Sequence, residues 1–441
     1  MKRFAGLAAI VVALSATTAT ARTGERFVAP AGPLVGIVGN QVFGHLARFD
    51  PVTLQPGPRR VGLGDYQAGW SFSPDRRELV LGNDNESCVG GATGLRFVDL
   101  AHMKVLGDVR LVADGPVEAT AWPDPTHLLA VVAVSDCLTT KQTVVFSVDV
   151  ATRRVVAETP LPGDLLGSAL VHGKLVVLLA PHGRIGLARI ATVDALGRLH
   201  GTVLAQINAG RVFPSATSST SLTRLDVPAL AVDAGSGSAY VVPAGDRLAA
   251  VDLQTMRVSY HNLSEKTSLF SRFLRWLDPA AQAKGDDGPT REAVWLGNGL
   301  LALTGQDSTE TGGTYFNWST TVTPAGLRII DTRDWTFHTI NPAISQVQLE
   351  GGQLLATGQT YSANHNSSQS TFTGLIAYSL DGQERYRLFN GTEVDKIAAV
   401  GPRGYAAIPA AHGTERTATF NLTTGNLGRS YGTSLYELLL P

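Results

Sequence analysis

The chain has 441 residues, and its 36 Lys and Arg against 37 Asp and Glu leave a formal net charge of −1. That balance lacks the basic footprint of a nucleic-acid-binding protein, so we expect no nucleic-acid partner. Apolar residues make up 44% of the chain, which is enough for a large core and excludes global disorder.

The N-terminus has the pattern of an export signal. Two basic residues precede an apolar run at 4–16, and an Ala-x-Ala cleavage site ends at Ala21. The pattern predicts a signal peptide at 1–21 and a leader at 22–33, with an uncleaved anchor as the alternative. No later apolar run reaches about 18 residues, so we expect no transmembrane segment in the mature chain. We therefore expect a secreted or extracytoplasmic monomer, and the bias toward Ala, Gly, Arg, Leu and Val indicates a bacterial source.

A turn signature recurs along residues 34–441. Each copy has a short β-rich run, an acidic or turn residue, a few polar residues and a second β-rich run. The anchor residues are Asp50, Asp99, Asp149, Asp194, Asp252, Asp331, Ser379 and Asn421. Their spacings run from 42 to 79 residues. Most lie near the repeat of about 40–50 residues that is typical of a four-stranded propeller blade.

The pattern of each copy predicts strands joined by tight turns. An Asp or Asn side chain can bond backbone amides two residues on, and the flanking runs have the apolar patterns of buried strands. The first copy, at 34–63, has three strands, and the apolar run at 435–440 would supply a fourth. The sequence thus predicts an all-β propeller of four-stranded blades, eight favoured and seven as the alternative. Strands from both termini would close the ring and leave no open edge.

Short motifs extend this prediction to a resemblance. Ala239-Tyr240-Val241-Val242 lies where the Tyr-Val-Thr-Asn motif of YVTN repeats falls, and Asp334-Trp335 reverses the Trp-Asp dipeptide of WD repeats. The chain resembles secreted bacterial β-propellers of the broad WD-like and YVTN-like repeat superfamily, at fold level and over nearly all of the mature chain. Such propellers include binding scaffolds, lyases, glycosidases and quinoprotein subunits, so the resemblance implies no single activity.

The long connections fall in two classes, second-to-third within a blade and blade-to-blade, which share one face of a propeller. They are 83–93, 135–142, 208–227, 263–290, 305–326 and 358–373. Long loops on a rigid scaffold are the usual place for recognition, so we expect the binding site on this face. The alternative is that loops on this face simply tolerate insertion.

One insertion has helical spacing. Within 264–283, apolar residues recur every three or four positions from Leu269 to Leu277, with basic residues between them. We expect a short amphipathic helix there, either packed on the ring as a lid or used for a partner or a membrane surface.

The two cysteines, Cys88 and Cys137, lie 49 positions apart in second-to-third loops of consecutive blades. In an exported chain this arrangement predicts a disulfide, with two free thiols as the alternative. Neither has the flanking Cys or His of a metal site, so we expect no metal. We also expect no cofactor, although the acidic cluster around Asp84 offers oxygens for calcium.

Two classes of function stay open. Tyr315, Phe316, Trp318 and Tyr361 lie in polar loops of two consecutive blades, and we predict them as ligand-binding residues for an extracellular peptide, glycan or protein. We favour a non-catalytic binding scaffold and assign no catalytic residue, because none of the common catalytic motifs occurs. The alternative is a lyase or glycoside hydrolase with its site at the central mouth. His45, His182, His365 and His412 could converge there, and a His beside an acid would favour the enzyme.

Overall fold

A computed structural model describes residues 34–38, 44–83, 93–135, 140–212, 224–265, 288–314, 317–410, 415–435 and 438–439. The predicted signal peptide at 1–21 and the leader at 22–33 lie outside these ranges. So do Cys88, Cys137 and Asp84, so the disulfide and the calcium site stay predictions.

The described residues form β-strands and no α-helix. Four sheets of consecutive strands make up much of the chain. They are β4–β7 (Tyr66–Phe72, Glu78–Asn83, Gly94–Asp99, Lys104–Arg110), β8–β11 (Val117–Asp124, His127–Ser135, Thr140–Asp149, Arg154–Leu161), β17–β20 (Ala229–Asp233, Ser238–Val242, Arg247–Asp252, Val258–Asn262) and β31–β34 (Ile397–Val400, Arg403–Pro409, Glu415–Asn421, Leu427–Tyr431). A fifth sheet has five strands, β12–β16 (Asp164–Val171, Lys174–Ala180, Gly186–Asp194, Leu199–Val212, Arg224–Asp226).

A ten-stranded sheet contains two further meanders, β22-β23-β25-β26 and β27-β28-β29-β30, which are joined through β24. Its strands are β21 (Ser264–Glu265), β22 (Gly288–Gly297), β23 (Leu300–Thr314), β24 (Asn317–Pro324), β25 (Leu327–Asp331), β26 (Thr336–Asn341), β27 (Gln346–Glu350), β28 (Gln353–Asn364), β29 (Ser367–Tyr378) and β30 (Glu384–Leu388). Together with the sheet that contains both chain ends, the described residues form eight antiparallel meanders.

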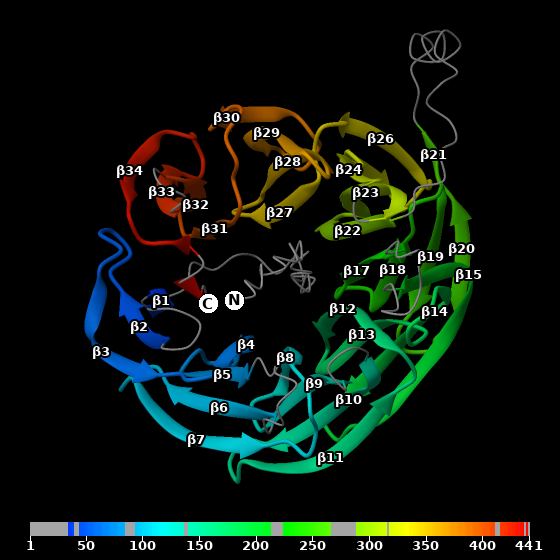
Figure 1. The fold of residues 1–441 in the computed structure, drawn as a ribbon. Helices are drawn as coiled ribbons and strands as arrows, with labels where there is room; N and C mark the ends of the chain where they lie inside the picture. Colours follow the sequence, from blue (N-terminus) through cyan, green and yellow to red (C-terminus); the bar gives the residue numbers. More distant parts are fainter. Residues whose placement is uncertain are drawn as a thin grey trace, which may run out of the picture.

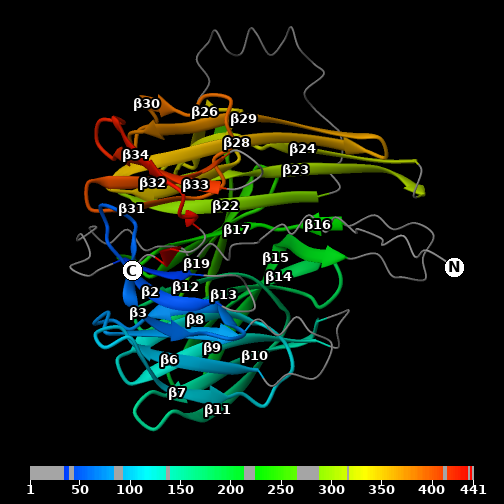
Figure 2. The same cartoon turned by 60° about the vertical axis from the view of Figure 1, so that its left-hand side comes forward.

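The sheets stand around a common axis as a closed ring. Figure 1 shows β4, β8, β12, β17, β22, β27 and β31 next to the axis, with β7, β11, β15, β20, β26, β30 and β34 on the outside. Figure 2 shows the same ring turned about the vertical axis. The predicted all-β propeller of four-stranded sheets is confirmed.

The ring closes through strands from both ends of the chain, as predicted. Strands β1 (Leu34–Val38), β2 (His45–Phe49) and β3 (Pro56–Gly62) form a sheet with β35 (Leu438–Leu439), which pairs antiparallel with β1. The Tyr405 hydroxyl donates a hydrogen bond to the Pro51 carbonyl over 3.1 Å, and so joins the last sheet to the first. Strand β35 thus covers the edge of β1 that faces the ring axis and holds the first sheet to the end of the chain.

The eight predicted turn anchors all lie between the third and fourth strands of a meander. The N–H of Gln254 donates to Asp252 Oδ1 over 2.9 Å, and the N–H of Thr423 donates to Asn421 Oδ1 over 3.0 Å. The side-chain oxygen satisfies backbone groups that the turn would otherwise leave unpaired. The predicted chemistry of the repeat is therefore confirmed.

These turns share a backbone feature that the residue types did not reveal. Four residues after the anchor, the chain adopts positive φ, at Leu54 (52°), Met103 (51°) and Met256 (54°), with Gly425 (73°) in the last copy. A type I turn followed by a left-handed residue makes a bulged hairpin, which matches the register shift found in several of these pairs. Burial of the Leu and Met side chains offsets the backbone cost at non-Gly positions.

The core lies between neighbouring sheets, because each sheet is covered on both faces. In β13, Leu175 and Val177 pack toward the β8–β11 sheet, whereas Val176 and Leu178 pack toward the β17–β20 sheet. Side chains alternate between faces with a period of two, so a strand buried on both sides must be apolar throughout. Each fully buried Val or Leu contributes about 1.5–3 kcal/mol.

The predicted helical segment differs in the structure. Ser264 and Glu265, expected to start a helix, form strand β21, which pairs in parallel with Thr336 and Phe337 of β26. An exposed edge of β26 offers backbone groups to this segment, and these compete with helix formation. The rest of the predicted helix lies outside the described residues. Over the residues that are described, no helix is long and apolar enough to cross a membrane.

Candidate functional site

The two faces of the ring differ in their connections. On one face, which we call the short-turn face, neighbouring strands are joined by tight turns, such as the two residues between β12 and β13. The other, the insertion-bearing face, carries the second-to-third and sheet-to-sheet connections. The expected asymmetry between the faces is therefore present in the described residues.

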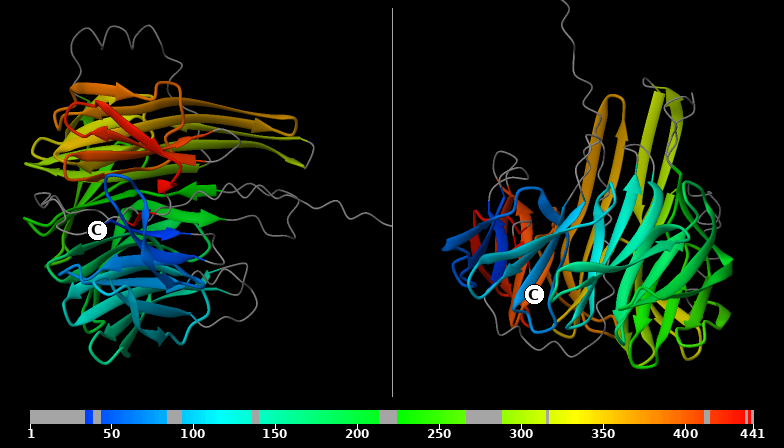
Figure 3. Two further views of the ribbon diagram at one scale, coloured as in Figure 1. Left: turned by 90° about the vertical axis from the view of Figure 1, so that its left-hand side faces the viewer. Right: turned by 90° about the horizontal axis from the view of Figure 1, so that it is seen from below.

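Two of the predicted long loops, 305–326 and 358–373, are instead strands. β23 continues into β24 and β28 into β29, and both hairpins extend beyond the ring from the insertion-bearing face (Figure 3). The hairpins pair with each other, with Ser319 opposite Asn364 and Val322 opposite Tyr361. These segments are rich in Ser, Thr, Asn and Gln and have no regular apolar alternation, so their composition is typical of loops and does not predict strands.

We call this feature the projecting sheet, defined as residues 306–324 and 359–373. It contains two of the four predicted ligand-binding residues within the described part of the chain. Trp318 lies in β24 with its backbone opposite Gly312, and Tyr361 lies in β28 and is partly exposed. Tyr315 and Phe316 lie outside the described residues. The hairpins are neighbours, as expected, and the binding role of the four residues stays a prediction.

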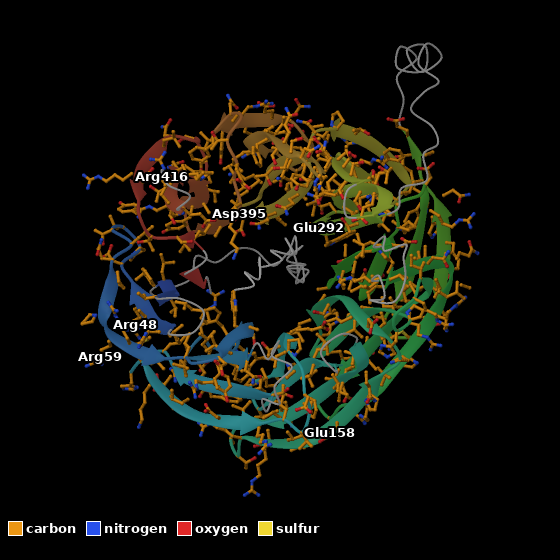
Figure 4. All side chains as sticks on the ribbon, in the orientation of Figure 1. Arg48, Arg59, Glu158, Glu292, Asp395 and Arg416 are labelled. Carbon is orange, nitrogen blue, oxygen red and sulfur yellow. The ribbon has the colours of Figure 1, made fainter. Side chains whose placement is uncertain are left out.

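Acidic residues gather where first strands begin on the insertion-bearing face. Glu118 is the second residue of β8, Asp164 the first of β12 and Glu292 the fifth of β22, while Glu393 and Asp395 directly precede β31. We call these five residues the acidic rim. In Figure 4, Glu292 and Asp395 lie on the inner side of the ring, whereas Glu158 and Arg59 lie on its outside.

Two carboxyl groups of the acidic rim have strongly raised pKa values. Burial raises the pKa of Glu118 to about 7, with a smaller opposing effect of Arg211 and a reinforcing one of Asp164. Burial likewise raises the pKa of Glu292 to about 7. The Glu118 Oε2 atom is buried and has no hydrogen-bond partner among the described residues. Carboxyl groups of this kind are favoured at functional sites, because they titrate near neutral pH.

One imidazole lies beside an acid of the rim. His182, between β13 and β14, places Nδ1 at 2.5 Å from Asp164 Oδ1, and the N–H of Gly183 donates to Asp164 Oδ2 over 3.2 Å. The carboxylate thus orients the imidazole through Nδ1, the arrangement that holds the histidine in many acid–base sites.

The other predicted histidines do not join His182. His45 begins β2 in another sheet, and His365 lies at the tip of the β28–β29 hairpin. His412 lies outside the described residues. Among the residues that are placed, no group of three His, Cys, Asp or Glu could hold a metal ion.

A polar hollow lies at the foot of the projecting sheet, next to the acidic rim. About 400 Å³ of space, part of it open to solvent, separates β27 from the bulge of β28 and from the segment before β31. Its lining includes Gln306, Gln346, Thr357, Gln359, Phe372 and Glu393. Its lining is mostly polar, in contrast to the mainly apolar lining of most small-ligand sites.

A second group of charges stands behind the hollow. Burial raises the pKa of Glu415, and a hydrogen bond with Asp395 adds to the rise, while the Ser434 hydroxyl donates to Glu415 over 2.9 Å and opposes it. Burial lowers the pKa of Lys396, against the attraction of both acids. Two carboxyl groups in hydrogen-bond contact favour holding one proton between them.

Sequence reasoning missed the acidic rim and the hollow. Each rim acid occupies a comparable place in its repeat, at or just before a first strand, but the strand boundaries are needed to see that shared place. The hollow joins residues of β23, β27, β28 and β29 with the segment before β31, which only the closed ring brings together.

Comparison with known proteins supports the fold. No protein-family profile and no curated protein sequence matches the chain. Among solved structures, dihydro-heme d1 dehydrogenase NirN in complex with DHE resembles it with a TM-score of 0.54 and 12% identity, over 94% of this chain and 76% of that one.

Two other solved structures are described as propellers. The Cps50 (Swd1) β-propeller domain of Myceliophteria thermophila has a TM-score of 0.40 and 10% identity, over 90% of this chain and 89% of that one. The Dos1 propeller has a TM-score of 0.46 and 12% identity, over 85% of both chains. At 12% identity the likeness to NirN shows the fold alone.

Proposed function

We propose that this chain is an extracytoplasmic, non-catalytic binding propeller that recognises a peptide, glycan or protein partner on its insertion-bearing face. The observation that supports the proposal most is the pairing of β24 with β28, which joins hairpins of two consecutive meanders into one sheet. Ring closure does not need this sheet. Ordering about 30 residues costs roughly 1–2 kcal/mol per residue in backbone entropy, and the projecting sheet buries little apolar surface to offset that cost. A binding function explains why such a sheet is nevertheless formed.

The amino-acid composition of the projecting sheet is typical of a contact surface. Its strands are rich in Ser, Thr, Asn and Gln, with Tyr361 and Phe372 among them. Aromatic side chains supply contact area at low entropic cost, and hydroxyl and amide groups supply adaptable hydrogen bonds. The predicted signal peptide at 1–21 is the support for an extracytoplasmic location.

A photoreactive residue tests which face binds. We would place p-benzoylphenylalanine at Tyr361 on the projecting sheet and, as a matched control, at Leu196, which is 55% exposed on the short-turn face. After exposure to the secreted proteins and envelope fraction of the host, we expect cross-linked partners from position 361 and none from 196. Equal labelling from both positions, or labelling from 196 alone, contradicts the proposal.

A propeller enzyme is the second candidate, and the contact between His182 and Asp164 favours it. An imidazole held by a carboxylate can act as a general base, and Glu118, with a pKa of about 7, can hold a proton nearby. If the chain is an enzyme, it should hydrolyse chromogenic esters or glycosides, and His182→Ala should abolish that activity. If the chain is a binding protein, neither the native chain nor the variant should hydrolyse them.

A further inference from the structure

We propose that the polar hollow at the foot of the projecting sheet binds a neutral saccharide. This inference rests on the proposed binding function and names the ligand class. The hollow lies where β27, the base of both projecting hairpins and the segment before β31 meet, so a ligand there would contact three structural units at once.

The lining has the donors and acceptors that vicinal hydroxyl groups need. Gln306, Gln346 and Gln359 each bring an amide, which can donate and accept at the same time. Thr357, which is buried, adds a hydroxyl group. A sugar hydroxyl is likewise both donor and acceptor, so each of its hydrogen bonds can be matched here without any net charge.

The hollow also has an aromatic and an acidic wall. Phe372, opposite Gln359 in the sheet register, lines it from β29. Aromatic rings present an apolar face to the C–H groups of a sugar ring. Glu393 and Asp395 line the inner wall, and carboxylates accept strong hydrogen bonds from adjacent hydroxyl groups.

The same lining disfavours two other ligand classes. No Lys or Arg is among the lining residues, and the two acids repel phosphate or carboxylate groups, which disfavours an anionic ligand. Phe372 and Val394 are its main apolar residues, so a lipid or hydrophobic ligand would leave the amides unpaired. A polycation is the remaining competitor, because it would be drawn to Glu393 and Asp395.

Saturation-transfer NMR and calorimetry on the full mature chain test the inference. The probes are glucose, galactose, mannose, N-acetylglucosamine, cellobiose and chitobiose, with spermidine as the cationic probe. We expect saturable binding of at least one saccharide. Gln346→Ala and Gln359→Ala should each weaken it about tenfold, since each removes roughly two hydrogen bonds.

Two further variants separate the competing explanations. Gln254→Ala, on the short-turn face, is the matched control and should leave saccharide binding unchanged. Glu393→Gln keeps hydrogen-bonding capacity but removes the charge, so saccharide binding should persist within a few-fold.

Spermidine binding that Glu393→Gln abolishes, with no saccharide binding, would assign the hollow to cations and overturn the inference. Failure of every probe would overturn it as well. Partner cross-linking through position 361 would then still stand, so this failure is distinguishable from failure of the proposed binding function.

Discussion

Asp194 on the short-turn face and Glu118 on the insertion-bearing face are carboxyl groups with opposite environments. On the short-turn face, hydrogen bonds that outweigh the effect of burial lower the pKa of Asp194, through the N–H groups of Arg198 and Leu196 and the Arg198 side chain. On the insertion-bearing face, burial raises the pKa of Glu118 and Glu292 to about 7. Asp194 is therefore satisfied by hydrogen bonds, whereas the Oε2 atom of Glu118 is buried and has no partner among the described residues.

The difference distinguishes a carboxyl group that stabilises the fold from one that costs stability. A carboxylate that receives several hydrogen bonds stabilises the turn that holds it, and the ring repeats that arrangement in most of its sheets. A buried carboxyl group without partners costs stability, and such costs are tolerated mainly where a ligand or a reaction needs the group. Asp194 thus stabilises a turn of the short-turn face, whereas Glu118 lies on the face that carries the candidate site.

The largest expected effect comes from opening the ring, on which both faces depend. Deleting residues 435–441 removes the buried Leu435 and strand β35, and leaves β1 with an unpaired edge. We expect a loss of about 4 kcal/mol, from one buried Leu and several backbone hydrogen bonds. That corresponds to a fall in Tm of about 8–16 °C by circular dichroism. Deleting only 440–441 is the control, and an unchanged Tm in the longer deletion would argue against closure by β35.

A smaller effect is expected from one satisfied turn. Asp194 accepts the N–H groups of Leu196 and Arg198, both over 3.0 Å. Asp194→Ala leaves these donors without an acceptor, and we expect a loss of about 1–2 kcal/mol, or about 2–8 °C in Tm. Asp194→Asn keeps the acceptor, as Asn421 does in the last copy, and should lose less. Equal losses in both variants would show that the turn depends on the charge and not on the hydrogen bonds.

The repeated turns explain why the fold could be predicted. The anchors from Asp50 to Asn421 use local chemistry, since their hydrogen bonds reach residues only two to four positions away. Local chemistry is visible in a sequence without knowledge of the fold. Ring closure could also be predicted, because the first copy has only three strands and the C-terminal apolar run can supply the fourth.

The candidate site could be predicted only in part. The insertion-bearing face followed from where the long connections fall, and the neighbourhood of the two hairpins followed from the order of the sheets. Their strand structure did not, because the pairing of β24 with β28 is a contact between separate repeats that no local pattern encodes. The contact of His182 with Asp164 lies within one sheet, and it depends on the pairing of β12 with β13, which sets Asp164 opposite Ala180.

The central difference between the faces has a direct signature in pH. A raised pKa in the folded state means that the folded protein binds the Glu118 proton more tightly than the unfolded chain does. The stability that Glu118 contributes is thus present below its unfolded pKa of 4.5 and is lost as pH rises toward about 7. A lowered pKa has the opposite consequence, so the contribution of Asp194 is present above 3.8 and is lost as pH falls through its folded value.

The most direct test is the Tm of Glu118→Gln and Asp194→Asn, each measured against the native chain from pH 3 to pH 8. Glu118→Gln should match the native Tm near pH 4 and exceed it by several degrees at pH 8, because the variant carries no charge to desolvate. Asp194→Asn should be less stable than the native chain at pH 8, with a difference that shrinks toward pH 3. Differences that run in the same direction for both variants, or that do not change with pH, would contradict the contrast between the hydrogen-bonded Asp194 and the buried, unpaired Glu118.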